Sequence, residues 1–192
     1  MRTLVVLTEE PSVKALLEGL LPRLLPEGIS FRVIPFEGKQ DLERQLVKKI
    51  RNWLQPDTSF IVLRDQDSGN CLEIKDNLQK LCIQAGRPDA IVRIVCRELE
   101  SWYLGDLDAV ETALQLKGIA RKGSISKYRN PDRLNNASEE LGLLTNGKYR
   151  KISGSRRLGP ILKLDGSNRS ISFGHFCLSV GRIAVLAREF LC

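Results

Sequence analysis

The stretch from Phe60 to Gly69 reads F-I-V-L-R-D-Q-D-S-G, an apolar run that passes directly into a polar, acidic segment. The first four residues predict a strand that is buried on both faces. Asp65 and Asp67 follow this strand, and alternation along an extended chain points residues i and i+2 the same way. The stretch therefore predicts a buried strand that presents two carboxylates together at its carboxyl end.

Similar apolar runs lie on both sides of this stretch, and helical patterns separate them. Apolar residues recur at 3.6-residue spacing between the runs, and Pro11 stands where a proline opens a helix. Strands that alternate with helices form a parallel sheet with right-handed crossovers. We expect an α/β, Rossmann-like sandwich, with a four-stranded, mainly parallel sheet and helices on both faces. The expected strands cover residues 3–7, 31–34, 60–63 and 90–96.

The pattern changes after residue 98, where strand signals give way to helical and basic segments. We therefore divide the chain into an α/β domain, residues 1–105, and a basic, mostly helical extension packed on it, residues 106–192. The helices expected in this second part of the chain cover residues 99–116, 137–144 and 173 to 190 or 191.

Charge is distributed unevenly along the 192 residues, whose formal net charge is +7. Residues 1–114 carry 15 basic and 18 acidic side chains, whereas residues 115–192 carry 15 basic and 5 acidic ones. A strongly basic half fits a polyanionic partner, and it equally fits a basic face that keeps the protein in solution.

Several classes of protein are excluded by what the sequence lacks. No apolar run approaches the roughly 18–20 residues that cross a bilayer, and the N-terminus has no signal-peptide pattern. The five cysteines are scattered without a C-x-x-C pair, which predicts reduced thiols in a cytoplasmic protein and no zinc site. Without a G-x-x-x-x-G-K-[ST] motif, we expect no intrinsic ATPase activity.

Acidic residues follow three of the expected strands. Besides the two aspartates after the third strand, Glu9 and Glu10 follow the first, and Glu98 and Glu100 follow the fourth. The carboxyl ends of parallel strands meet at one edge of a sheet, where function gathers. Mg²⁺ prefers carboxylate, water and phosphate oxygens, so this edge is a candidate metal site. The alternative is structural: aspartates suit turns, and acids suit the first turn of a helix.

The strings T-E-E-P-S (residues 8–12) and L-R-D-Q-D-S-G (residues 63–69) resemble the Toprim superfamily. This superfamily includes the catalytic domains of type IA and type II topoisomerases, bacterial primases and the overcoming-lysogenization-defect nucleases. Its members carry a Glu after the first strand, usually followed by Gly, and a D-x-D after the third. Here Glu10 replaces that glycine and adds negative charge and bulk, so we assign the Toprim role to Glu9.

Two further strings, R-E-L-E-S-W-Y-L-G-D (residues 97–106) and Y-R-K-I-S-G-S-R-R (residues 149–157), resemble a bacterial Toprim-related family that is labelled a domain of unknown function. Members of that family are often found beside AAA-type or SMC-like ATPases in phage-defence settings. The resemblance implies that Asp65 and Asp67 bind Mg²⁺ or Mn²⁺. It further implies that Glu9 completes the metal shell or acts as general acid/base. Glu98 and Glu100 would supply ligands for a second ion.

A dense basic stretch with one tyrosine interleaved is the candidate phosphate-binding segment. Positive side chains near an acidic metal site are what a phosphodiester backbone needs. An exposed basic loop without a ligand is the alternative. The basic residues of this segment are Lys148, Arg150, Lys151, Arg156 and Arg157.

Other conspicuous residues receive structural interpretations. Trp102 and Tyr103 are expected to pack between the two parts of the chain, and Asp106 is expected to cap a helix. His175, the only histidine, lies between two phenylalanines and is expected to be partly buried rather than a catalytic base.

Together these features predict Mg²⁺-dependent phosphodiester hydrolysis by a Toprim-like nuclease acting on DNA or RNA. The resemblance implies an effector of a phage-defence system that works with a separate ATPase. A non-catalytic, Toprim-like binding or regulatory module for such an ATPase is the alternative. An enzyme for a small phosphorylated metabolite is a third hypothesis, against which the broad basic half argues.

Overall fold

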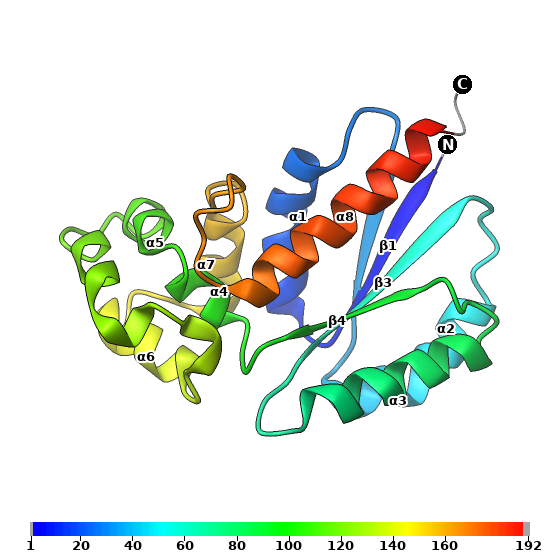
Figure 1. Ribbon diagram of the computed structural model, residues 1–192, viewed down its shortest axis with the longest axis horizontal. Coiled ribbons are helices and arrows are strands. Elements are labelled where there is room, and N and C mark those ends of the chain that lie inside the picture. The colour runs from blue at the N-terminus through cyan, green and yellow to red at the C-terminus, as the bar shows by residue number, and fades with distance from the viewer. Residues whose placement is uncertain (1, 190–192) are drawn as a thin grey trace.

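A computed structural model describes residues 2–189 and has the expected α/β architecture (Figure 1). The strands form one sheet in the order β2-β1-β3-β4, and every neighbouring pair is parallel. The prediction of a four-stranded, mainly parallel sheet is therefore confirmed. The strands are β1 (Thr3–Thr8), β2 (Ser30–Pro35), β3 (Thr58–Asp65) and β4 (Ile91–Val95).

Helices cover both faces of this sheet. The three crossover helices are α1 (Pro11–Leu24), α2 (Lys39–Arg51) and α3 (Cys71–Gln84). The last helix, α8 (Ile171–Glu189), packs with α1 on one face, while α2 and α3 cover the other (Figure 1).

The central strand β1 shows why the strands read as continuous apolar runs. Leu4 and Val6 belong to the core under α1 and α8, whereas Val5 and Leu7 belong to the core under α2 and α3. All four side chains are fully buried. Because both faces of the strand are covered, neither set of alternate positions can be polar.

The second half of the chain lies beyond the carboxyl edge of the sheet, except for α8 (Figure 1). Its apolar side chains are continuous with the core beneath α1, so residues on both sides of position 105 share one core. Its α-helices are α4 (Glu100–Leu104), α5 (Leu107–Ala113), α6 (Ala137–Leu144) and α7 (Lys151–Leu158). Three 3₁₀ turns precede α6, namely η1 (Ala120–Ser124), η2 (Ser126–Tyr128) and η3 (Pro131–Arg133).

The single helix expected at residues 99–116 is wrong, because the chain breaks between α4 and α5. At Gly105 a Cβ atom would lie 2.1 Å from Oδ1 of Asn168, so the chain passes very close to a distant loop here. Asp106 then caps α5, since its Oδ1 accepts a hydrogen bond from the N–H of Ala109 at 3.1 Å. The expected cap role of Asp106 is confirmed. Helix α7 also lies in a stretch for which no helix was expected.

The aromatic residues after β4 behave as expected, but the histidine does not. Trp102 and Tyr103 are fully buried, and the Trp102 indole donates a hydrogen bond to Ser172 Oγ at 2.9 Å. Phe173 and Phe176 take the inner face of α8. His175 falls on the opposite face and is exposed, so its expected partial burial is wrong.

The described part of the chain contains neither a disulfide nor a membrane-length helix. Its four cysteines are free thiols, and Cys192 lies outside the described residues. Within residues 2–189, no helix combines the length and the apolar character required to cross a bilayer.

Helices α1 and α7 approach each other through glycine. A Cβ atom at Gly159, just after α7, would lie 2.2 Å from the carbonyl oxygen of Leu16. A Cβ atom at Gly19 would lie 2.6 Å from the ring of Pro160. The second half of the chain is therefore held against α1 by backbone packing that a larger side chain would separate.

We predict that Gly159→Ala lowers the free energy of unfolding by about 1–3 kcal/mol, because the added methyl overpacks a backbone contact. Urea denaturation of both proteins measures this change. The matched control is Gly142→Ala in α6, where a Cβ atom has nothing within 4 Å. We expect this control to be neutral or to gain up to about 1 kcal/mol from its better helix propensity. Equal effects of the two substitutions would contradict the close packing of α1 on α7.

Candidate functional site

The expected acidic residues gather at the carboxyl edge of the sheet. The register pairs Thr8 with Leu63 and Asp65 with Val95, so β1, β3 and β4 end beside one another. Glu9 continues from β1, and Glu100 begins α4 shortly after β4. These carboxylates come from separate parts of the sequence and share one edge, which we call the acidic edge: Glu9, Glu10, Asp65, Asp67 and Glu100.

Glu9 is buried at the centre of this edge, with 8% of its surface exposed. Its Oε2 atom has no hydrogen-bond partner among the described residues. The nearest cation is Arg64, whose Nε lies 3.8 Å from that oxygen. Burial and the neighbouring carboxylate of Asp67 raise the pKa of Glu9, against the opposing effect of Arg64.

Asp65 ends β3 and is half-buried between the buried carboxylates of Glu9 and Glu100. One of its oxygens, Oδ2, accepts a hydrogen bond from the N–H of Leu99 at 3.2 Å. Burial, followed by the charges of Glu9 and Glu100, raises the pKa of Asp65 well above its usual range. A single backbone donor therefore does not compensate the negative charge at this position.

Asp67 lies at the more exposed side of the edge and has a left-handed backbone conformation, with φ of 52°. Aspartate is among the few non-glycine residues that adopt this conformation readily. Its N–H donates to the carbonyl of Arg97 at 2.8 Å, which ties the loop after β3 to the turn after β4. Its carboxylate forms an ion pair with Lys39 at 2.8 Å.

The structure separates Glu98 from Glu100, which the sequence treated as equivalent. Glu98 Oε2 accepts a hydrogen bond from the N–H of Ser138 at 2.8 Å, so it binds the first turn of α6. Glu100 is buried, with 2% of its surface exposed, and accepts a hydrogen bond from the Tyr149 hydroxyl at 2.8 Å. Burial raises the pKa of Glu100. Only Glu100 belongs to the acidic edge.

Glu10 is positioned by the helix that follows it. It is the N-cap residue of α1, and its Oε2 accepts a hydrogen bond from Ser12 Oγ at 2.9 Å. Lys151, the first residue of α7, places its Nζ 3.5 Å from the same oxygen. Burial lowers the pKa of Lys151, but the carboxylates of Glu100 and Glu10 outweigh that effect and leave it raised.

The five basic residues of the candidate phosphate-binding segment occupy different places. Lys151 reaches the acidic edge, while Lys148 and Arg150 are exposed just before α7. Arg156 and Arg157 are exposed near the far end of α7, about 8 Å further along its axis. The structure therefore brings one of the five to the carboxylates and leaves four on the surface.

Comparison with known families identifies the chain. The profile of a domain of unknown function, DUF4276, matches residues 8–180. The chain belongs to the DUF4276 family. None of the curated proteins and none of the solved structures compared with it gave a match.

Three polar residues of this DUF4276 domain contribute to the acidic edge without having been predicted. Lys39 starts α2 after Gly38, whose φ is 95°. Arg64 lies between Glu9 and Glu43 and forms an ion pair with each. Tyr149 was noted only as an aromatic residue within a basic stretch. Sequence separation hid all three contacts.

The donors of the acidic edge fit a hard divalent cation in kind. They are carboxylate oxygens, which hard divalent cations prefer. One of them, Oε2 of Glu9, is buried without a hydrogen-bond partner among the described residues. A bound cation would also relieve the repulsion between the crowded carboxylates. Within residues 2–189, no three acidic, histidine or cysteine side chains already converge as a formed metal site. Asp67 is turned toward Lys39 instead. An ion at this edge would be held by Asp65, Glu9 and a reoriented Asp67.

We predict that Tyr149→Phe lowers the free energy of unfolding by about 1–3 kcal/mol, because it leaves the buried Glu100 carboxylate without its phenolic donor. The matched control is Tyr103→Phe, because the two rings pack together with centroids 5.9 Å apart. The Tyr103 hydroxyl donates to the neutral Ser155 hydroxyl at 2.7 Å, so its loss costs less. Chemical denaturation measures both variants, and an equal loss in the two would contradict a stronger bond from Tyr149 to Glu100 than from Tyr103 to Ser155.

Proposed function

We propose that this domain is a metal-dependent phosphodiesterase that acts on nucleic acid, with the acidic edge as its catalytic centre. The observation that carries the proposal is the meeting of Glu9, Asp65 and Glu100 at one poorly solvated edge. These residues follow three different strands or begin the helix after them, so local structure does not explain their proximity. Perturbed carboxylates that gather at such an edge favour a functional role.

The electrostatics of the edge support cation binding. Each of the three carboxylates has a raised pKa, caused first by burial. A divalent cation held by carboxylate oxygens would offset that cost. When bound, Mg²⁺ or Mn²⁺ polarises phosphoryl oxygens and lowers the pKa of a coordinated water. In the proposal Asp65 and Asp67 would hold the ion, and Glu9 would complete its shell or deprotonate the attacking water through Oε2, which accepts no hydrogen bond from the described residues.

Cations and helix ends beside the carboxylates support a phosphate substrate. Lys39 opens α2 and Lys151 opens α7, and both ammonium groups are already placed at the acidic edge. Helix α1 also begins there, after Glu10. Helix N-termini favour anions because their first N–H groups lack partners within the helix. A phosphodiester at this edge would replace carboxylates as the partner of the two lysines.

A polymeric substrate fits the surface charge better than a small metabolite does. Lys148, Arg150, Arg156 and Arg157 are exposed and lie along α7 and the turn before it. A small ligand at the edge would not reach the far end of the helix, whereas a strand of DNA or RNA would follow it. Contacts to successive phosphates are the main source of affinity for nucleic acids.

A second candidate function is a non-catalytic, Toprim-like module that binds an AAA-type or SMC-like ATPase. Two of the acidic-edge carboxylates are already paired with lysines, and Glu10 stands where Toprim domains usually have glycine. An acidic edge whose carboxylates are already paired with lysines of the same chain would suit a structural role. The resemblance to a family found beside such ATPases in phage defence supports the same partner.

The test is nuclease activity of the full chain with Mg²⁺ or Mn²⁺ on single- and double-stranded DNA and RNA. We predict that Asp67→Asn lowers cleavage by about 100-fold or more. Loss of a residue that only orients a metal ligand costs up to about 100-fold, and loss of the ligand itself should cost at least as much. Asp57→Asn is the matched control. Asp57 has the same φ of 52° but precedes β3, at the opposite edge of the sheet.

Asn tolerates the left-handed conformation as well as Asp does, so both variants should fold alike. Cleavage by wild type and by Asp57→Asn, and its loss in Asp67→Asn and on addition of EDTA, are the expected results. Equal cleavage by all three proteins would attribute the activity to a contaminant and contradict the proposal. Absence of cleavage with the wild type on every substrate, together with binding to an ATPase partner, would favour the non-catalytic module.

A further inference from the structure

The outward face of α8 carries an apolar stripe that nothing within residues 2–189 covers. Ile171, Leu178 and Val185 are 60%, 63% and 57% exposed and recur every seven residues. Gly174 and Gly181 lie between them, and a Cβ atom at either glycine would have nothing within 4 Å. Apolar residues at heptad spacing form the seam of paired helices, and glycine lets two helices approach closely.

Other exposed apolar side chains in the described part of the chain do not form such a pattern. Leu72 and Ile83 both lie on α3, but the polar residues Lys75, Asp76 and Lys80 separate them. The remainder lie singly on different elements, as is normal for a protein surface. They are Leu54, Ile125, Leu143 and Ile152.

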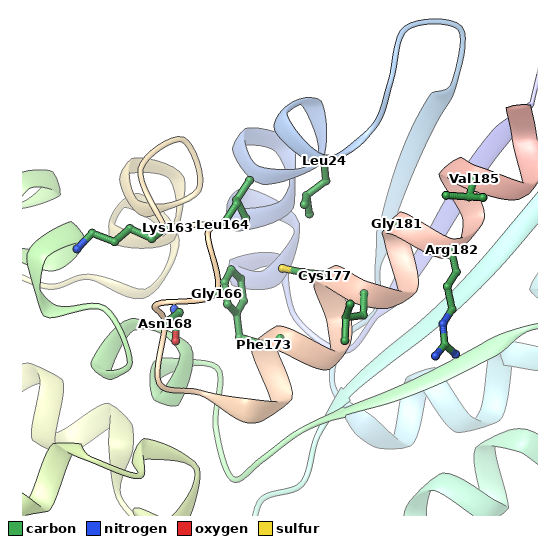
Figure 2. A pocket seen from close by; sticks show the side chains of 12 residues that line it. Leu24, Lys163, Leu164, Gly166, Asn168, Phe173, Cys177, Gly181, Arg182 and Val185 are labelled. Atoms are coloured by element: carbon green, nitrogen blue, oxygen red, sulfur yellow. The ribbon is translucent and has the colours of Figure 1, made fainter.

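A groove adjoins the stripe and makes the surface beside it concave. It has a volume of about 890 Å³ and lies between α8, the end of α1 and the loop after α7 (Figure 2). Leu24, Leu164, Phe173 and Cys177 line it together with Leu178 of the stripe. Leu178 and Val185 of the stripe line this groove, and α8 lies on the face of the sheet away from α2 and α3 (Figure 1).

We propose that this surface is a homodimer interface, in which α8 pairs antiparallel with α8 of a second copy about a two-fold axis near Leu178. The proposal does not rest on the phosphodiesterase activity. Its strongest support is that the apolar residues and the glycines of the stripe are spaced almost symmetrically on the two sides of Leu178. Ile171 lies seven residues before Leu178 and Val185 seven after, while Gly174 lies four before and Gly181 three after.

This near-symmetry makes the surface complementary to itself. In an antiparallel pair centred on Leu178, Ile171 faces Val185 of the second copy, and Gly174 lies near Gly181 of the second copy. Each large apolar side chain of the stripe therefore meets an apolar residue, while Gly174 faces Arg182 and Gly181 faces His175 of the second copy, so a glycine leaves room for each of these polar side chains. A two-fold interface uses the same patch on both subunits, which is the requirement that this stripe meets.

Charge selects the antiparallel arrangement over the parallel one. Arg182 is exposed beside the stripe, four residues after Leu178. In a parallel pair the two Arg182 side chains would lie side by side. In the antiparallel pair each Arg182 backbone position is about 6 Å along the axis from the two-fold, so the two positions are about 12 Å apart. That backbone separation exceeds the Debye length of about 8 Å at physiological ionic strength, so side chains that extend away from the axis repel each other less than in the parallel pair.

The test is sedimentation velocity of the full chain over a wide concentration range. We expect wild type to shift reversibly from monomer to dimer, and Leu178→Glu to stay monomeric. Leu143→Glu is the matched control, because Leu143 is 68% exposed on α6 and should leave the dimer intact. Gly181→Gln is a second seam variant. Its side chain has open space within the monomer, so it should fold normally and still block close approach of two helices.

Cross-linking tests the geometry. A residue on the two-fold axis meets its own copy, so Leu178→Cys should give more dimer with a short bis-maleimide than wild type or Leu143→Cys. A wild type that stays monomeric at every concentration would overturn the proposal. So would a dimer that persists equally in Leu178→Glu and Gly181→Gln, or a Leu178→Cys protein that cross-links no better than Leu143→Cys.

Discussion

The crowding of Glu9, Asp65 and Glu100 at one poorly solvated edge is the constraint on which the arrangement of this molecule depends. A parallel sheet brings the ends of β1, β3 and β4 together, and burial then raises the pKa of all three carboxylates. The fold must supply compensating groups or the edge must bind a cation. Both the ion pairs at this edge and the proposed metal chemistry follow from that single electrostatic requirement.

The compensating groups come from distant parts of the chain, which makes the second half of the sequence part of the site. Tyr149 donates to Glu100, and Lys151 pairs with Glu10 from the first turn of α7. Helix α7 can deliver these groups because Gly159 lets it lie directly against α1. The acidic edge therefore depends on packing between elements that are more than a hundred residues apart in sequence.

The sequence predicted the sheet and the meeting of Glu9 and Asp65 at one of its edges, because both have local signals. Continuous apolar runs mark strands covered on two faces, and strand ends in a parallel sheet must coincide. The different positions and partners of the Glu98 and Glu100 side chains could not be predicted, since both residues stand in one acidic motif. Only tertiary contacts with Ser138 and Tyr149 distinguish them. The contact of Lys39 with the edge likewise arises from folding alone.

The central claim is that the acidic edge binds a divalent cation, and titration calorimetry with Mn²⁺ or Mg²⁺ tests it most directly. Wild type and the double variant Asp65→Ala/Asp67→Ala are compared at modest salt, with and without an oligonucleotide. Saturable binding to wild type that is lost in the variant is the expected result. Binding to neither protein, even with the oligonucleotide present, or equal binding to both, would contradict it.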